Sequence, residues 1–136
     1  MQMIDVTCAI ILKGGKILAT QRSERMNLPL KWEFPGGKIE HNETPEECLQ
    51  REIREELKLE IEFLKKLETR SFAYETFSIN LIPFITNYIS GEISLTEHKD
   101  FRWLRIEELI FLDWAPADIP VVEDFLKLNY DTTRTL

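Results

Sequence analysis

Apolar runs separated by turn-forming residues dominate the first part of the chain. Val6–Leu12 forms an apolar run rich in Ile and Val, and a glycine pair separates it from a second run, Lys16–Thr20. This pattern predicts a β-hairpin of two buried strands. Ser23–Lys31 is polar and predicts a loop, and Trp32–Phe34 predicts a short strand that a Pro-Gly-Gly sequence ends.

A helix is predicted from Thr44 to about Leu57. The Thr44 side chain can accept from the free amides of the first turn, Pro45 suits the first helical position, and Glu47 completes a capping box. An apolar stripe on one side of this helix should face the core. The residues of the stripe are Leu49, Ile53 and Leu57.

The rest of the chain predicts further strands and a final helix. β-Branched and aromatic residues are enriched in Glu60–Thr69 and Phe72–Asn87, which we interpret as strands around a turn. The remaining predicted elements are a turn and strand over Tyr88–Leu95 broken at Gly91, a strand over Phe101–Leu104, a helical turn over Ile106–Leu109, an amphipathic helix over Asp118–Leu128 and a frayed tail over Asp131–Leu136. A mixed α/β (α+β) chain of 136 residues without repeats or linkers predicts a single domain over residues 1–136.

The charge of the chain is concentrated in one segment. Glu40–Glu62 holds nine acidic and three basic residues, and it accounts for almost all of the net charge of −7. This balance argues against a general binder of nucleic-acid polymers, which needs a basic face. An acidic surface also repels phosphates unless a cation intervenes. The segment is therefore either a solvated helix face or a site for a divalent metal ion.

Features of membrane proteins and exported proteins are missing from the sequence. Its longest uncharged runs, such as Phe77–Ser90, fall short of the roughly 18 apolar residues of a membrane span. Met1–Leu12 has no basic start, long apolar core or small-residue cleavage site, so we expect no signal peptide. Two cysteines, Cys8 and Cys48, are too few for a disulfide framework. We therefore expect a cytoplasmic protein that does not bind membranes.

Three glutamates lie on one edge of the apolar stripe of the predicted helix. At about 100° per residue, Glu52, Glu55 and Glu56 fall on the same side. Like charges three and four residues apart destabilise an isolated helix by a few tenths of a kcal/mol, so helix stability alone does not explain them. Mg²⁺ would remove the repulsion, because it takes oxygen ligands and bridges carboxylates to substrate phosphates. Arg51 is expected to pair with Glu47 or Glu55 and to hold a carboxylate in place.

A glycine-containing segment precedes this helix. Pro35-Gly36-Gly37-Lys38 would let the backbone approach a ligand closely, and Lys38 supplies a cation for phosphate. Acidic residues on a helix usually form a solvated face, and a lone glycine pair is usually a turn. The two features together are much rarer than either alone.

This combination resembles the Nudix box. The pattern of that family is Gly, five residues, Glu, seven residues, Arg-Glu, an aliphatic residue, any residue, Glu-Glu, any residue, Gly and an aliphatic residue. The chain has Gly37, Glu43 and then Arg51-Glu52-Ile53-Arg54-Glu55-Glu56-Leu57-Lys58-Leu59 at this spacing. Lys58 stands where the family has glycine, a residue suited to a left-handed helix exit. The resemblance covers most of the chain, and Trp32–Lys38 is similar to the MutT branch of the family.

The resemblance implies both a fold and an activity. The fold of the family is a mixed β-sheet sandwiched between α-helices. Its activity is hydrolysis of nucleoside triphosphates to a nucleoside monophosphate and pyrophosphate, with Mg²⁺ or Mn²⁺ bound. The implied metal ligands are Glu52, Glu55, Glu56 and the Gly36 carbonyl, and either Glu52 or Glu56 is implied to help deprotonate the water. A further carboxylate comes from a later loop, for which Glu97 is the candidate, with a plain loop acid as the alternative.

Substrate contacts are implied at four positions. Arg22 could reach a phosphate or the base, with a surface arginine as the alternative, and Lys38 would contact phosphate. Phe34 stands where the branch contacts the base, with a core position as the alternative. Asp118 lies in Trp114–Pro120, a stretch similar to the base-recognition end of the branch, especially of its CTP-cleaving members. The alternative role of Asp118 is the N-cap of the last helix.

An ionised Asp118 only accepts hydrogen bonds, which predicts a preference among bases. It favours cytosine through N4–H, or guanine through N1–H and N2–H, and disfavours uracil and thymine. We expect CTP, dCTP or modified dCTP as the substrate, with 8-oxo-dGTP as the alternative. A non-catalytic Nudix-fold binding module and an acidic interaction domain without metal are the rival functions, and we expect a monomer or a homodimer. His41 and His98 show no ligand spacing and are expected at the surface.

Overall fold

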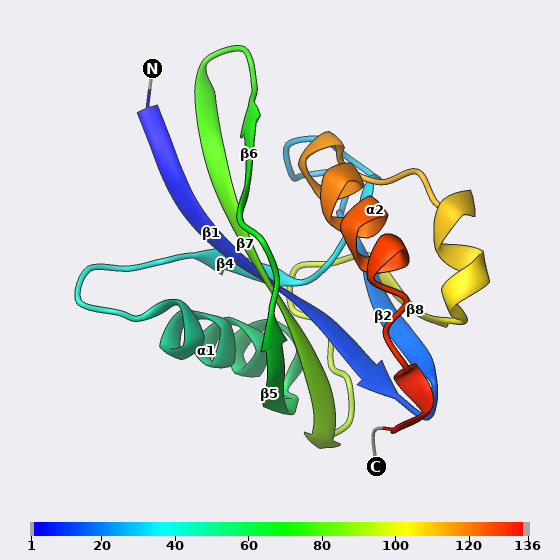
Figure 1. Ribbon diagram of the computed structural model, residues 1–136. Coiled ribbons are helices and arrows are strands. Elements are labelled where there is room, and N and C mark those ends of the chain that lie inside the picture. Colours follow the sequence, from blue (N-terminus) through cyan, green and yellow to red (C-terminus); the bar gives the residue numbers. More distant parts are fainter. Residues whose placement is uncertain (1, 135–136) are drawn as a thin grey trace.

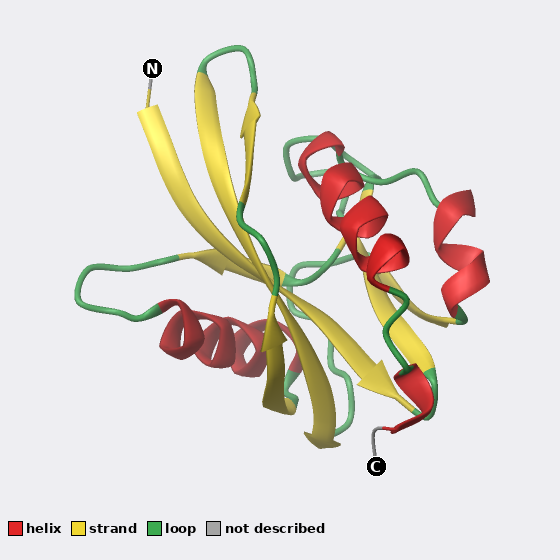
Figure 2. Ribbon diagram, in the orientation of Figure 1, coloured by secondary structure: helices red, strands yellow, loops and turns green. Residues whose placement is uncertain are grey.

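The computed structural model describes residues 2–134, and within them eight strands form one sheet with helices on both sides (Figures 1 and 2). The strands are β1 (Gln2–Lys13), β2 (Lys16–Gln21), β3 (Trp32–Glu33), β4 (Gly36–Lys38), β5 (Glu60–Lys66), β6 (Arg70–Ala73), β7 (Phe77–Ser90) and β8 (Asp100–Leu104). The helices are α1 (Pro45–Leu57), α2 (Ile119–Leu128) and the 3₁₀ helices η1 (Ile106–Phe111), η2 (Pro116–Asp118) and η3 (Thr132–Arg134). None of the helices in this described part is long and apolar enough to cross a membrane.

The sheet is mixed because its two longest strands run parallel to each other. β1 and β7 pair from Gln2, opposite Phe77, to Leu12, opposite Asn87. The other strand pairs are antiparallel, in the order β3-β2-β1-β7-β5, with β4 paired to β1, β6 to β7 and β8 to β2. Since β7 occupies one edge of β1, the other edge is shared between β4 at Val6–Cys8 and β2 at the end of the strand.

Alternation along β1 gives each face of the sheet its own core. Ala9 and Ile11 belong to the cluster under α1, whereas Ile10 and Leu12 belong to the cluster under α2. The α1 side chains in the first cluster are Leu49, Ile53 and Leu57. The α2 side chains in the second cluster are Val121, Val122 and Phe125. The expected mixed sheet between helices is therefore confirmed, as Figure 2 shows.

Both ends of α1 have the geometry that their residues favour. Thr44 Oγ1 accepts from the Glu47 amide at 3.1 Å, and Glu47 Oε1 accepts from the Thr44 amide at 2.9 Å, so the capping box is confirmed. At the exit, Lys58 adopts φ 63° and ψ 35°, and its amide donates to the Arg54 carbonyl at 3.1 Å. This is the left-handed exit that glycine favours, and it costs a lysine about 1 kcal/mol.

Some strand boundaries differ from the prediction. β3 ends at Glu33, ahead of the Pro-Gly-Gly sequence as predicted, but Gly36 and Gly37 then begin a further strand, β4, which pairs with Thr7 and Cys8 of β1. Gly36 lies so close to the β1 backbone that a Cβ there would clash with the Thr7 carbonyl. The predicted strand Phe72–Asn87 is instead split into β6 and β7 by a tight turn. No strand lies within residues 91–99, which form a loop after Ser90.

The predicted frayed tail is partly ordered. Thr132–Arg134 form η3, and Thr132 is buried. Residues 135 and 136 lie outside the described residues. The frayed tail was therefore wrong for its first part, because a buried threonine ties the chain to the rest of the molecule.

Candidate active site

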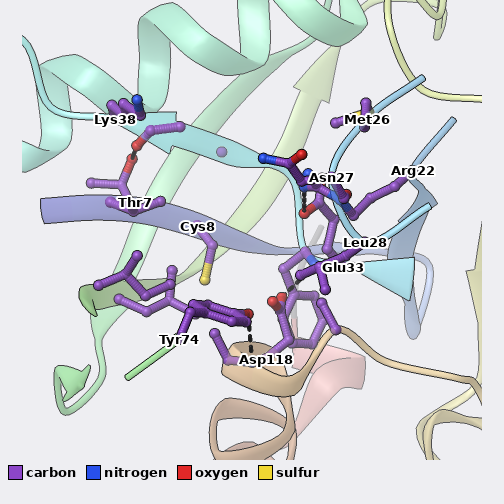
Figure 3. Close-up of a pocket in the computed structure, with 18 of the residues that line it drawn as sticks. Thr7, Cys8, Arg22, Met26, Asn27, Leu28, Glu33, Lys38, Tyr74 and Asp118 are labelled. Atoms are coloured by element: carbon purple, nitrogen blue, oxygen red, sulfur yellow. Dashed lines mark hydrogen bonds and ion pairs between the residues drawn. The ribbon is translucent and has the colours of Figure 1, made fainter. Parts of the chain in front are cut away.

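A cavity of about 360 Å³ lies between the middle of β1, the β3–β4 segment, the turn after β6 and η2 (Figure 3). Its walls thus come from elements that are far apart in the sequence. The sequence-predicted residues that line it are Arg22, Phe34, Gly36, Lys38, Glu56 and Asp118. The other predicted residues, on α1 and in the loop before β8, are Arg51, Glu52, Glu55 and Glu97.

Arg51 ties the acidic edge of α1 together. Its Nε donates to Glu43 at 2.6 Å, and its Nη1 donates to Glu52 at 2.9 Å and to Glu55 at 3.3 Å. The expected pairing with Glu55 is present, whereas Glu47 is used in the capping box instead. The bond between Arg51 and Glu43 is the main cause of a raised pKa for Arg51 and of a pKa lowered to about 2 for Glu43. Arg51 therefore stays charged and holds two of the three helix glutamates through one nitrogen.

Gly37 allows the Glu52 carboxylate to lie against the backbone of β4. A Cβ at position 37 would occupy the space of the Glu52 carboxyl group. Gly36 is packed in the same way against the Thr7 backbone. The fixed spacing between this glycine pair and the glutamates of α1 follows from these contacts, because only glycine leaves room for the carboxylate.

Glu56 has the environment least suited to a charged carboxylate. Its Oε1 is buried and has no hydrogen-bond partner within residues 2–134. Burial is the main cause of a pKa raised to about 9. The nearby charges that add to this shift are those of Glu52, Glu33, Glu97 and Glu55. Without a bound cation, Glu56 is therefore protonated at neutral pH.

The acidic edge offers oxygen donors for Mg²⁺ but no preassembled cage. In the described part of the chain, no group of three His, Cys, Asp or Glu side chains could hold a metal ion as it stands. Burial also raises the pKa of Glu52, which Arg51 opposes by donating to it. The unpartnered oxygen of Glu56 beside further carboxylates nevertheless fits a hard cation, because Mg²⁺ keeps several waters and needs only one or two carboxylates. The site thus suits an ion that brings waters or substrate phosphates with it.

The loop between β7 and β8 brings Glu97 toward the acidic edge. Its neighbour Thr96 donates through Oγ1 to the Glu56 carbonyl at 3.3 Å. The charge of Glu97 adds to the burial that raises the pKa of both Glu52 and Glu56. Glu97 itself is exposed to solvent. The structure therefore places this loop acid close to the helix glutamates.

Glu33 and His98 form a contact that the sequence reasoning missed. Glu33 Oε1 accepts from Arg22 Nη1 at 2.8 Å, and Glu33 Oε2 lies 2.8 Å from His98 Nε2. The expected surface position of His98 was wrong, because Glu33 gives the imidazole a polar partner in the interior and its side chain has no exposed area. His41 is exposed, as expected. The signal that could have singled out Glu33 is an acid placed between the two aromatic residues of a short strand.

Asp118 lies across the cavity from Lys38 and is buried (Figure 3). Its Oδ2 accepts from the Phe34 amide at 2.9 Å, and its side chain makes no capping bond to α2 within the described residues. The N-cap alternative is therefore wrong for the side chain, because the carboxylate is turned toward the segment after β3. Burial raises the pKa of Asp118 well above its usual range, and the charge of Glu33 adds to the shift.

Aromatic and sulfur-containing side chains surround Asp118. The Phe34 ring is buried 4.8 Å from the Trp114 ring, so Phe34 belongs to the core and also lines the cavity. The Tyr74 hydroxyl accepts from the Ala117 amide at 3.3 Å. Cys8 points from β1 toward Tyr74, and burial raises the pKa of its thiol (Figure 3). Mostly apolar walls with a few polar groups are typical of a small-molecule site.

The two expected phosphate-contacting cations lie in different settings. Arg22 is held in place, since its Nε donates to the Asn27 carbonyl at 2.6 Å and its Nη1 to Glu33. Lys38 is exposed, and its carbonyl accepts from Arg51 Nη2 at 3.3 Å. Arg22 thus forms a fixed wall of the cavity, whereas the Lys38 side chain can move with a ligand.

Comparisons with known proteins agree with these features. Residues 1–125 match the family described as the NUDIX domain. The chain is 36% identical to the CTP pyrophosphohydrolase of Escherichia coli (strain K12) over 129 residues, which cover 95% of this chain and 96% of that protein. It is 31% identical to the 8-oxo-dGTP diphosphatase of Haemophilus influenzae over 131 residues, which cover 96% of each. The solution structure of a MutT protein from methicillin-resistant Staphylococcus aureus 252 matches with a TM-score of 0.76 and 46% identity, covering 94% of this chain and 99% of that one.

Proposed function

Because the chain belongs to the Nudix family and is a hydrolase of phosphoanhydride bonds, we propose that it cleaves nucleoside triphosphates to a nucleoside monophosphate and pyrophosphate. The observation that carries this proposal is the buried, unpartnered carboxyl group of Glu56 at the cavity wall. A carboxyl group that stays neutral until a cation reaches it suits a site that takes up a metal ion with an anionic substrate. A non-catalytic binding module or an acidic interaction domain needs no such group.

Mg²⁺ is the proposed cofactor, with Mn²⁺ able to replace it. Glu52, Glu55, Glu56 and the Gly36 carbonyl would hold the ion, which neutralises phosphate charge and lowers the pKa of a bound water when present. Arg51 orients Glu52 and Glu55 through its Nη1. Either Glu52 or Glu56 receives the proton of the attacking water, and Glu97 assists from the loop before β8.

The cavity walls position the rest of the substrate. Arg22 and Lys38 face the triphosphate or its leaving group, since both line the cavity that Glu56 also lines. Phe34 and Asp118 contact the base at the other side of the cavity. Phe34 and Asp118 are 84 positions apart in the sequence, and the hydrogen bond from the Phe34 amide to Asp118 Oδ2 joins the two sides of the proposed base site.

Cytosine nucleotides, CTP and dCTP or a modified dCTP, are the proposed substrates. An ionised Asp118 accepts from cytosine N4–H, and a relative with 36% identity is named CTP pyrophosphohydrolase. 8-Oxo-dGTP is the second candidate, because the same carboxylate accepts from guanine N1–H and N2–H and a relative with 31% identity is named 8-oxo-dGTP diphosphatase. The acid form of Asp118 could also donate to a carbonyl of thymine or uracil, so its protonation state decides the selectivity.

A nucleotide panel tests the proposal. CTP, dCTP, dTTP and 8-oxo-dGTP are incubated with Mg²⁺, and released pyrophosphate is scored against released phosphate. We expect pyrophosphate and a monophosphate, with activity lost in excess chelator and restored by Mg²⁺ or Mn²⁺. Glu62→Gln, which removes an exposed acid of β5, is the matched control that retains activity when Glu56→Gln does not. Full activity in excess chelator, or release of single phosphates, contradicts the proposal.

The remaining expectations stay proposals of the same kind. Cys8 and Cys48, the two cysteines of the chain, are both buried and free, which supports a reducing, cytoplasmic setting. The net charge of −7 supports a small anionic substrate bound with metal over a nucleic-acid polymer or a membrane surface. A monomer or a homodimer is expected, and light scattering after size exclusion distinguishes the two.

A further inference from the structure

The loop of residues 91–99 is fixed at one end to the last turn of α1. The Ser94 amide donates to the Leu57 carbonyl at 3.1 Å, and Thr96 Oγ1 donates to the Glu56 carbonyl at 3.3 Å. The last carbonyls of a helix have no partner within the helix, so the loop supplies partners that they would otherwise lack. The loop is thereby attached to the same turn that carries the Glu56 side chain.

The other end of the loop is fixed to β2 and β3, whose residue Glu33 also lines the cavity. The Lys99 amide donates to the Gln21 carbonyl at 2.9 Å, and His98 Nε2 lies 2.8 Å from Glu33 Oε2. Arg22 holds the second oxygen of Glu33 at 2.8 Å. The Glu33 carboxylate is thus fixed from two directions, and it accepts a hydrogen bond from an imidazole whose side chain has no exposed area. A buried contact of this kind holds its partners more rigidly than an exposed one.

Glu97 stands directly between these two anchors. Thr96 precedes it and is bonded to α1, and His98 follows it and is bonded to Glu33. The side chain of Glu97 itself is exposed. Its distance from Glu52 and Glu56 is therefore set by its two neighbours.

We propose that His98 is a positioning residue, which through Glu33 holds the Glu97 carboxylate in place beside the acidic edge of α1. The inference rests on the proposed hydrolysis. It adds to the reaction a residue that touches neither the substrate nor a metal ion. A small displacement of a catalytic group lowers the rate strongly, so the contact acts on turnover more than on binding.

Two substitutions separate positioning from simple space filling. His98→Leu keeps an apolar side chain in the interior but removes the donor, whereas His98→Gln keeps an N–H donor that can reach Glu33. We expect His98→Leu to lower kcat by about ten- to a hundredfold with little change in KM. His98→Gln should recover most of the lost kcat. Equal losses in both variants would overturn the proposal, because they would show that the donor has no role.

A double-mutant cycle with Glu97→Gln tests whether His98 acts through Glu97. If it does, His98→Leu causes no further loss of kcat once Glu97 has been replaced. Losses that multiply in the double variant would overturn the proposal, since they would show that His98 acts independently of Glu97.

Hydrogen exchange tests the same contact without any activity. In His98→Leu, the Lys99 amide, which donates to the Gln21 carbonyl beside the His98 contact, should exchange more than about tenfold faster, and His98→Gln should restore its protection. The amides of β1 serve as the internal control for an intact fold. Unchanged exchange at the Lys99 amide would overturn the positioning role. If the unmodified protein cleaves no nucleotide, the proposed function fails, and the exchange result alone still decides the inference.

Discussion

The acidic edge of α1 and the end of the cavity at Asp118, which we propose as its base end, both bury a carboxyl group, but they are built in opposite ways. At the acidic edge, Glu56 lies within one helix turn of two other glutamates, and Arg51 restrains their carboxylates. At the base end, Asp118 meets a single backbone amide, that of Phe34, and mostly apolar walls. One region therefore gathers several carboxylates on one helix, whereas the other holds a single aspartate among mostly apolar side chains, with Glu33 and Arg22 as the nearby charges.

From this difference we expect the two regions to have different roles. The pKa of Glu56 is raised by burial and by several like charges, so the arrival of a cation changes its protonation state. The pKa of Asp118 is raised mainly by burial, so the hydrogen bonds offered by a base change its state. On the proposed function, the acidic edge would respond to total charge, whereas the base end would respond to the pattern of hydrogen-bond donors and acceptors. Substitutions in the two regions should consequently affect different kinetic constants.

The largest effect is expected at the acidic edge. Glu56→Gln keeps the size of the side chain but removes the carboxyl group that can ionise when a cation binds, so we expect kcat to fall by about two to four orders of magnitude with little change in folding. Pyrophosphate release with saturating Mg²⁺ measures the loss, and circular dichroism checks the fold. A variant that retains more than half of the activity would remove Glu56 from the reaction.

The next effect is expected at the base end and concerns selectivity. Asp118→Asn replaces an acceptor pair by one donor and one acceptor, so the preference for dCTP over dTTP should fall about ten- to a hundredfold in kcat/KM. Because burial raises the pKa of Asp118, the unmodified enzyme should also prefer dCTP more strongly as the pH rises and the side chain ionises. If dTTP is as good a substrate as dCTP at every pH, Asp118 does not contact the base.

A smaller effect is expected on the stability of the folded protein, which should depend both on pH and on bound Mg²⁺. The pKa of Glu56 is about 9 in the folded protein and 4.5 in the reference state, so the folded state binds the proton more tightly. In chelator, the contribution of Glu56 to stability should therefore be greatest below pH 4.5 and should decline as the pH rises toward 9.

Mg²⁺ should raise the melting temperature, because an ion at a hundredfold excess over its Kd adds about 2.7 kcal/mol to the free energy of unfolding. Melting curves at pH 6 and 8.5, with and without Mg²⁺, measure both effects, and Glu56→Gln should reduce the pH-dependent decline, with Glu52 and Asp118 accounting for the remainder. A melting temperature unaffected by Mg²⁺ would argue against an ion site that forms before substrate binds.

The smallest effect is expected at the exit of α1. Lys58 holds φ 63°, a conformation that glycine adopts without strain, so Lys58→Gly should stabilise the fold by about 1 kcal/mol. Urea unfolding measures the change, and kcat should stay the same. Lys58→Ala is the matched control, because it removes the bond from the lysine Nζ to the Glu55 carbonyl without relieving the backbone. Equal stability of the two variants would show that the backbone conformation costs little.

The parts of the molecule that the sequence predicts correctly are those that depend on neighbouring residues. The capping box at Thr44, the apolar stripe of α1 and the pairing of Arg51 with Glu55 all arise within a few turns of one helix. For such features, residues that are close in the sequence are also close in the structure.

The parts that it misses depend on partners far along the chain. β4 forms because β1 offers it an edge, so the glycine pair in isolation suggests only a turn. The role of Asp118 as a side-chain cap was wrong because Phe34, 84 residues away, supplies the donor. His98 has no motif of its own, and its burial becomes visible only when Glu33 is seen beside it. Packing between distant segments decides these positions, and a single sequence carries little signal for it.

The Cys8 thiol in the cavity wall has a chemical consequence of its own. Thiolates, and not thiols, are the species that react readily with peroxides and other electrophiles. Burial raises the pKa of Cys8, so at neutral pH the group stays a thiol. The cavity can therefore present a soft, polarizable sulfur surface to its ligand and still resist oxidation, which keeps the site intact under conditions that would inactivate an exposed, ionised cysteine.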